Sequence, residues 1–176
     1  FPMSSQFHIG INVAASHFRN GTLLKDLNQY WFSQHPIQQL VIELTERDAL
    51  LDVDYRVVRE LNRLGVKLAI DDFGTGNSSL SWLEKLRPDV LKIDKSFTSA
   101  IGTDAVNSTV TDIIIALGKK LNIELVAEGV ETQAQAQHLR RHGVHLLQGF
   151  LYAKPMPLRD FPKWLAGSTP PPARHN

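Results

Sequence analysis

Carboxylate side chains recur at the ends of short apolar runs in this chain, and they are the residues best suited to chemistry. Asp71 and Asp72 end one run, within AIDDFGTGNSSL at residues 69–80, and Glu43 and Glu128 end two others. Lys92 lies on a further run. Four carboxylates beside one lysine carry excess negative charge, and unpaired charges removed from water are strongly destabilising. Protonation, internal salt bridges or bound cations could each offset that cost.

The donor atoms of this set favour hard cations. All of these candidate ligands are oxygen donors, and none of the 7 histidines lies at the end of a predicted strand. Mg²⁺ or Mn²⁺ is therefore favoured over zinc. Adjacent aspartates at a turn can contact two neighbouring ions, and two ions about 3.5–4 Å apart suit phosphoryl displacement. Two simpler interpretations stay open: the Asp-Asp pair as a turn or cap signal, and Lys92 as a salt-bridge partner of Asp71 or Asp94 alone.

Alternating strand and helix patterns must position these side chains. Gly65 and Gly143 lie where helix C-caps are expected, and Thr132 is a candidate N-cap. This alternation predicts a parallel sheet, either doubly wound or closed as a barrel. The expected strands are 7–13, 40–44, 67–71, 90–94, 123–128 and 144–148, and the expected helices are 23–34, 55–64, 78–86, 105–121, 133–142 and 158–165.

Side-chain alternation along the strands favours the barrel. In KLAID, Leu68 and Ile70 share an aliphatic face, whereas Asp71 ends the opposite face, and the other predicted strands follow the same rule. An open doubly wound sheet needs two aliphatic faces, but a barrel interior carries its reactive groups at the top. An eight-stranded barrel needs about 250 residues. We therefore expect an α/β fold, a TIM-like (β/α)8 barrel that is incomplete at the N-terminus.

Composition excludes several classes of function. The chain has 176 residues, which fits one domain, and its formal net charge is +1 without a long run of one sign. Such a balance argues against direct DNA or RNA binding. No apolar stretch approaches the ~20 residues that cross a bilayer, and the absence of cysteine excludes thiolate nucleophiles. The start at Phe1 predicts a piece of a longer protein, with residues 1–167 as a partial domain and the proline-rich residues 168–176 as a disordered tail.

Six stretches of the sequence resemble one known family. They occur in the order that is typical of the family and extend over nearly all of residues 7–165. Together they resemble the EAL-domain cyclic di-GMP phosphodiesterases of bacteria. The stretches are INVAASHF (11–18), VIELTE (41–46), AIDDFGTGNSSL (69–80), PDVLKIDKSF (88–97), VAEGVET (126–132) and QGFLYAKPMP (148–157).

The resemblance implies a reaction and a role for each matching residue. The implied reaction is the metal-dependent hydrolysis of one phosphodiester of cyclic di-GMP, which gives the linear guanosine dinucleotide, with two Mg²⁺ or Mn²⁺ ions. Metal ligands would be Asn12, Glu43, Asp71, Asp72 and Glu128, with Asp71 bridging both ions. Lys92, Glu128 and Asp72 would be catalytic, and Asp94, Gln148 and Pro155 would face the substrate. Glu46 would clamp the loop 72–79, and Glu131 would support the loop after Glu128.

The chain departs from the family pattern at three places. The glutamate-alanine-leucine signature is absent together with the first strand, and its glutamate is a metal ligand in the family, so we expect an incomplete site and impaired activity in this chain alone. Ala14 and Asn77 stand where a serine and an aromatic residue are common. Two alternatives remain: a non-catalytic module that binds cyclic di-GMP or a protein partner, and another metal-dependent barrel hydrolase.

The resemblance also implies an assembly. We expect a homodimer through residues 96–115, and a sensor or membrane segment upstream in the parent protein. The domain would then be cytoplasmic, with a membrane-anchored parent as one arrangement.

Overall fold

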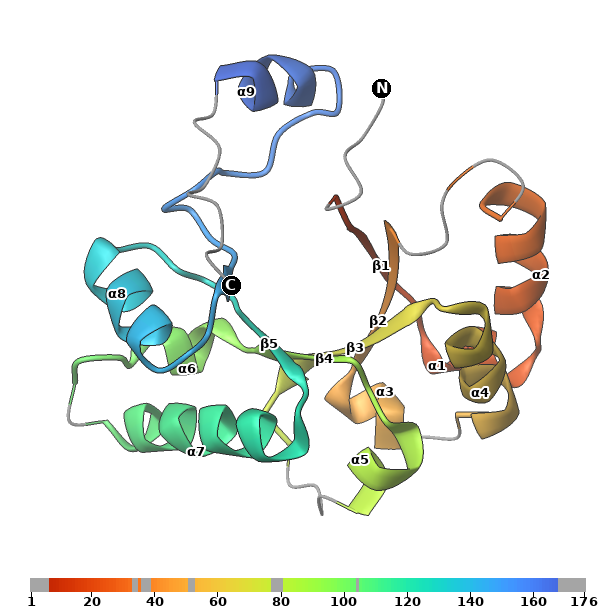
Figure 1. Cartoon of the computed structure of the whole chain (residues 1–176), viewed down its shortest axis with the longest axis horizontal. Helices are drawn as coiled ribbons and strands as arrows, with labels where there is room; N and C mark the ends of the chain where they lie inside the picture. Colours follow the sequence, from red (N-terminus) through yellow and green to blue (C-terminus); the bar gives the residue numbers. More distant parts are fainter. Residues whose placement is uncertain are drawn as a thin grey trace.

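The computed structural model describes residues 7–32, 35, 39–50, 53–76, 81–103 and 105–167. These residues form one six-stranded sheet whose strands follow chain order and are all parallel. Figure 1 shows a curved sheet with helices along one side of the arc, which is part of a barrel wall. The strands are β1 (Ile9–Asn12), β2 (Leu40–Thr45), β3 (Lys67–Phe73), β4 (Val90–Ile93), β5 (Glu124–Ala127) and β6 (Leu146–Leu147).

The helices follow the predicted strand–helix alternation but include short members that the sequence did not predict. The five-residue helices α1, α3 and α6 lie directly after β1, β2 and β4, and they are too short to show a helical periodicity. The expected helix at 78–86 begins at residue 81, and residues 78–80 lie outside the described part. The helices are α1 (Ala15–Arg19), α2 (Thr22–Tyr30), α3 (Glu46–Leu50), α4 (Tyr55–Leu64), α5 (Ser81–Leu86), α6 (Lys95–Ser99), α7 (Val106–Leu121), α8 (Gln133–Arg141) and α9 (Phe161–Gly167).

Helix caps explain several of these boundaries. Gly65 ends α4 with φ 81°, a left-handed conformation that costs glycine little. Thr132 begins α8 in a capping box with Gln135, in which each side chain accepts a hydrogen bond from the backbone of the other. Of the three predicted caps, Gly65 and Thr132 are confirmed. The C-cap of α8 is His142, and the predicted Gly143, with φ 83°, is the next residue.

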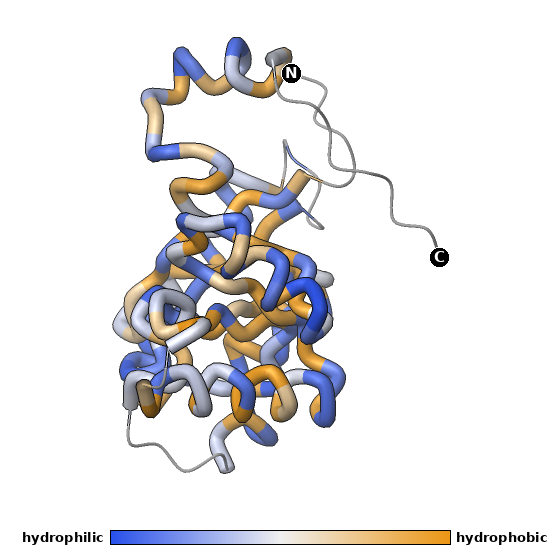
Figure 2. Tube along the Cα trace, turned by 90° about the vertical axis from the view of Figure 1, so that its left-hand side faces the viewer, coloured by the Kyte–Doolittle hydropathy of each residue, from blue (hydrophilic) through white to orange (hydrophobic). Residues whose placement is uncertain are grey.

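The core lies between the sheet and its helices. The aliphatic face predicted for β2 and β3 is buried, including Ile42, Leu68 and Ile70. Figure 2 shows hydrophobic residues concentrated in the middle of the trace. Ile11 of β1 departs from the pattern, with 37% of its surface exposed, because β1 is an edge strand of the described sheet. The opposite face carries the polar side chains, and part of it is also buried, including Ala69 and Lys92.

The last helix, α9, lies apart from the sheet (Figure 1) and has no buried residue. Its Phe161 ring makes an edge contact with Phe7. The expected strand at 144–148 is reduced to β6, residues 146–147, and the expected tail at 168–176 lies outside the described residues. Among the described residues, none of the helices combines the length and the apolar character that a bilayer crossing requires.

Candidate functional site

The buried lysine of β4 is the centre of the site. Lys92 Nζ lies 2.8 Å from Glu43 Oε2, 3.0 Å from Asp71 Oδ2 and 2.8 Å from Glu128 Oε1. These carboxylates come from β2, from β3 and from the residue that follows β5, so neighbouring parallel strands deliver them to one end of the sheet. The interpretation of Lys92 as the partner of a single aspartate is therefore too narrow, because Lys92 joins three carboxylates.

A β-bulge explains how two adjacent aspartates reach the same site. Ile70 pairs with Leu91 and Phe73 pairs with Ile93, so β3 places Asp71 and Asp72 opposite the single residue Lys92. Asp72 has φ 54°, and its N–H donates to Asp71 Oδ1 at 2.9 Å. In a regular strand the two side chains would point to opposite faces. Here Asp71, Asp72 and Glu128 each place a carboxylate oxygen within 4.8 Å of the others.

The electrostatics of the cluster show an excess of negative charge. Burial raises the pKa of Asp72, and the charges of Asp71 and Asp94 raise it further. Burial also raises the pKa of Glu128, against the lowering effect of Lys92. For Lys92, burial alone would lower the pKa, but the hydrogen bonds that it donates to Glu128, Glu43 and Asp71 outweigh this effect and raise the pKa well above its ordinary value. Lys92 is thus charged at neutral pH and does not neutralise all of its neighbours.

The side chains at the carboxyl ends of the strands form an acidic rim, and their donor atoms fit the hard divalent ions. The rim consists of Asn12, Glu43, Asp71, Asp72, Lys92 and Glu128. The three clustered carboxylates supply only oxygen atoms, as Mg²⁺ and Mn²⁺ prefer. Asn12, which ends β1, is in register with Glu43 of β2, so a further oxygen donor lies at the same end of the sheet. A cation here would relieve the repulsion that raises the pKa of Asp72.

Gly10 is a site residue that the sequence did not single out. A Cβ atom added to Gly10 would collide with Glu43 Oε1 and would lie 2.8 Å from Glu43 Cδ. Glycine is therefore needed on β1 for the Glu43 side chain to lie across it. A glycine within a strand is a known signal of close approach by another group, so the sequence held a weak indication.

Glu46 and Asp94 contact loops at the border of the site. The buried Glu46 accepts hydrogen bonds from the N–H groups of Gly74 at 2.9 Å and Gly76 at 3.3 Å, in the loop after β3. Residues 77–79 of that loop lie outside the described part. Asp94 caps α6 by accepting a hydrogen bond from Ser96 N–H at 2.9 Å.

Three predicted site residues, Gln148, Glu131 and Pro155, are exposed. Gln148 follows β6, and its backbone N–H donates to Ala127. Glu131 donates its backbone N–H to the Gln135 side chain, and Pro155 is exposed on the segment before α9. Within the described residues, no hydrogen bond or ion pair joins their side chains to the Lys92 cluster.

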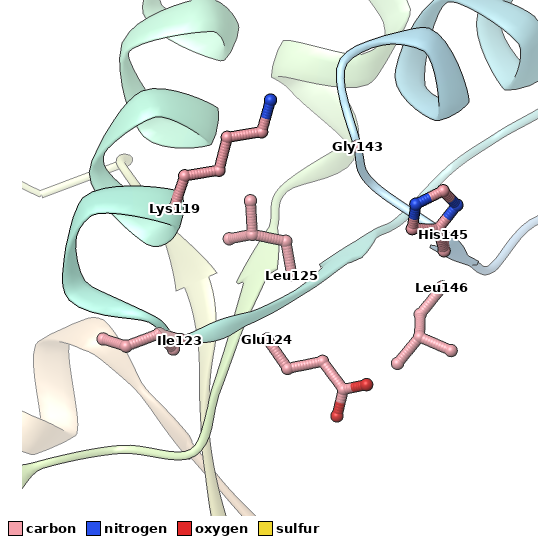
Figure 3. Close-up of a pocket in the computed structure, with 7 residues that line it drawn as sticks. All are labelled: Lys119, Ile123, Glu124, Leu125, Gly143, His145 and Leu146. Carbon is pink, nitrogen blue, oxygen red and sulfur yellow. The ribbon is translucent and has the colours of Figure 1, made fainter. Parts of the chain in front are cut away.

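The hollow in Figure 3 lies at the other end of the strands. It has a volume of about 130 Å³, and Glu124 and Leu146, the first residues of β5 and β6, line it with Lys119 and His145. Glu128 lies beyond the opposite end of β5. In TIM-like barrels the amino ends of the strands serve stability rather than catalysis, so this hollow is not the candidate site.

Fold and site together define a class of protein: a parallel α/β half-barrel with an acidic, lysine-centred rim at the carboxyl ends of its strands. The sequence profile of the EAL domain matches residues 2–155. The chain belongs to the EAL domain family, which confirms the family that the six motifs predicted.

Named relatives and solved structures agree with this assignment. The chain is 85% identical over 176 residues to "Probable cyclic di-GMP phosphodiesterase PdeD" of Escherichia coli (strain K12), covering 100% of this chain and 33% of that protein. It is similar to "PaMucR Phosphodiesterase, c-di-GMP complex", with 37% identity, a TM-score of 0.82 and coverage of 90% of this chain and 65% of that one.

A second similar structure is a complex with both a metal and the nucleotide. It is the "Klebsiella pneumoniae BlrP1 pH 9.0 manganese/cy-diGMP complex", with 32% identity, a TM-score of 0.72 and coverage of 84% of this chain and 39% of that one. These likenesses confirm the TIM-like barrel, incomplete here. The chain spans about a third of the curated relatives it matches, 33% for the first and 30% for the second.

Proposed function

We propose that the protein containing this domain hydrolyses cyclic di-GMP to the linear guanosine dinucleotide in a metal-dependent reaction. The observation that carries the proposal is the Lys92 cluster, in which Glu43, Asp71 and Glu128 surround one lysine beside the bulged Asp72. Relatives named as cyclic di-GMP phosphodiesterases, and structures described as complexes with that nucleotide, support the choice of substrate.

The proposed metal ligands are Asn12, Glu43, Asp71, Asp72 and Glu128, for Mg²⁺ or Mn²⁺. When bound, two such ions supply a water of lowered pKa and neutralise the phosphodiester anion. The other residues of the rim act on that chemistry from the protein side. Lys92 keeps its proton, and its three N–H donors are shared among Glu43, Asp71 and Glu128. A carboxylate that turned from Lys92 to a metal would release one donor for the attacking water or for the oxygens that gain charge in the transition state. Glu128 accepts a hydrogen bond from the same water and orients it.

Residues at the border of the rim are proposed to position substrate and loops. Asp94, Gln148 and Pro155 are proposed to face the nucleotide. Glu46 holds the loop that begins at Asp72 through its two backbone hydrogen bonds, which fixes the approach to the metals. Glu131 is proposed to support the loop after Glu128. Its backbone N–H donates to the side chain of Gln135, which belongs to the capping box of α8.

The direct test is an assay of cyclic di-GMP turnover with Mg²⁺, with Mn²⁺ and with a chelator. It should use the 176-residue chain and a version extended at its N-terminus by the segment that carries the family signature. We expect the extended version to form the linear dinucleotide only with metal, and the shorter chain to turn over more slowly. Binding of cyclic di-GMP without turnover under either metal would overturn the proposal and favour a binding module.

The parent protein is proposed to be a homodimer with an additional input segment. Residues 96–115 include two exposed apolar side chains on α7, Val106 and Ile113, which suit a protein–protein contact. The relatives are about three times as long as this chain, which leaves room for a sensor or membrane segment in the parent. We propose that the catalytic domain itself works in the cytoplasm.

Gly10→Ala is expected to lower the rate of hydrolysis at least about tenfold, because the new methyl group displaces the Glu43 carboxylate from Lys92 and the metals. Overall stability should fall moderately, because the displaced Glu43 loses its ion pair with Lys92 although alanine itself suits a strand interior better than glycine. The measurement is turnover over a range of Mn²⁺ concentrations, together with the Tm. Gly167→Ala is the matched control, because an added Cβ there meets nothing within 4 Å. Equal activity of both variants would contradict a steric role for Gly10.

A further inference from the structure

A second cluster of metal-ligating side chains lies between α7 and α8, away from the acidic rim. It consists of Asp112, His138 and His142, which can each place one ligand atom within 4.8 Å of the others. Figure 1 shows both helices on the same side of the sheet. We propose that these three residues form a binding site for a divalent transition ion of the Zn²⁺ class.

The two histidines are already held in a suitable orientation. They are four residues apart on α8 and its C-cap, so they share one helix face. Their ring centroids lie 4.2 Å apart with 29° between the planes. His142 Nδ1 lies 2.8 Å from the backbone oxygen of His138. Because a carbonyl oxygen only accepts, Nδ1 carries the proton and Nε2 keeps its lone pair for a metal, as is common in metal-ligating histidines.

The neighbouring helix supplies the charge that the imidazoles lack. Asp112 Oδ1 lies 3.7 Å from His138 Nε2, so one ion can contact both atoms at bond lengths of about 2.0–2.2 Å. The side chains are 56% and 29% exposed, respectively, so water can complete the coordination. Arg140 and Arg141, next to the histidines, are directed elsewhere, toward the Tyr152 hydroxyl and the Gln137 carbonyl. The C-terminal end of α8 also favours a cation.

The ligand types separate this site from the rim. Two imidazole nitrogens and one carboxylate oxygen suit Zn²⁺, Ni²⁺, Co²⁺ or Cu²⁺. The rim offers carboxylates and an amide, which suit Mg²⁺ and Mn²⁺. The site needs no contribution from the proposed hydrolysis, so the two proposals can fail independently. An ion bound here would join α7 to α8 and should make their packing more stable.

The test is a Zn²⁺ titration of the untagged chain, monitored by calorimetry. Excess Mg²⁺ is present to compete for the oxygen ligands of the rim. Co²⁺ in place of Zn²⁺ gives an absorption spectrum that reports nitrogen ligands. We expect one Zn²⁺ per chain and a rise in Tm. His138→Ala should weaken binding at least about tenfold, and Asp112→Asn should remove most of the Tm rise while the histidine pair still binds weakly. His145→Ala is the control, an exposed histidine outside the cluster.

A second measurement uses the unchanged chain, so it does not depend on whether the variants fold. Nitrogen-15 spectra of the imidazoles in the unchanged chain should show Zn²⁺-dependent shifts for His138 and His142, and none for His145. Zn²⁺ affinity that stays the same in the double variant His138→Ala, His142→Ala would overturn the proposal. Zn²⁺ displaced completely by excess Mg²⁺ would do so as well, because it would place the ion at the rim.

Discussion

Asp72→Asn is expected to reduce hydrolysis of cyclic di-GMP by more than about 100-fold. Substituting a residue that only hydrogen-bonds to a metal ligand already lowers metal affinity or activity by about 10- to 100-fold. The substitution removes one negative charge and little else. Asparagine has the same shape and tolerates the left-handed φ of 54°. The hydrogen bond from the residue 72 N–H to Asp71 Oδ1 comes from the backbone and is kept. The loss should therefore report on the proposed metal-ligating role of Asp72 rather than on the fold.

The measurement is product formation in Mn²⁺ beside calorimetric binding of cyclic di-GMP, both in the N-terminally extended version. Binding should persist when turnover is lost. Asp26→Asn, an exposed aspartate on α2, serves as the matched control and should keep full activity. Turnover by Asp72→Asn equal to that of the unchanged protein would contradict a metal-ligating role. Binding that is independent of both metal and residue 72 would favour the non-catalytic module.

Much of the site follows from two regularities of the sequence. Side chains alternate along a strand, and parallel strands present their carboxyl ends at one edge. Those rules place Glu43, Asp71, Lys92 and Glu128 on the same face and near the same end, and the structure brings them into contact. The sequence could not predict which carboxylates pair with Lys92. That pairing depends on the register between the strands, which places Lys92 opposite the bulge.

The bulge shows where alternation stops being informative. A strict two-residue period sends Asp71 and Asp72 to opposite faces, so it cannot explain why both reach the acidic cluster. The extra residue and the positive φ of Asp72 resolve this, and neither can be read from residue types alone. The cluster of Asp112 with His138 and His142 likewise cannot be predicted from residue types alone. The spacing of the histidines is visible in the sequence, but the aspartate joins them only through helix packing.

Lys92→Met is expected to destabilise the metal-free protein by about 3–5 kcal/mol, as is typical when one partner of a buried ion pair is removed. Methionine has a similar length and no charge. Its introduction leaves Glu43, Asp71 and Glu128 without their common cation, and their side chains are only 16%, 14% and 17% exposed. Lys67→Met is the matched control. Lys67 pairs with Glu124, both are 38% exposed, and such pairs contribute about 0–1 kcal/mol.

Denaturant unfolding in a chelator and in Mn²⁺ measures both effects. Mn²⁺ should raise the free energy of unfolding more in Lys92→Met than in the unchanged chain, because the variant has three uncompensated carboxylates and binds the ion more tightly in the folded state. Hydrolysis should still be lost, since the added metal charge does not replace the hydrogen bonds that Lys92 donates. Equal destabilisation by Lys67→Met, or an equal response to Mn²⁺, would contradict the central role of Lys92.

The pH dependence of the same variant separates a charge effect from a packing effect. Burial already raises the pKa of Glu128, and Lys92 is the group that lowers it, so Lys92→Met raises this pKa further. The folded variant then binds more protons than the unfolded chain at pH values above the ordinary pKa of glutamate, and its stability falls as the pH rises through that window. In a chelator, the deficit of Lys92→Met should be smallest at acid pH and should grow toward neutral pH. A lost packing contact would leave a deficit that is independent of pH.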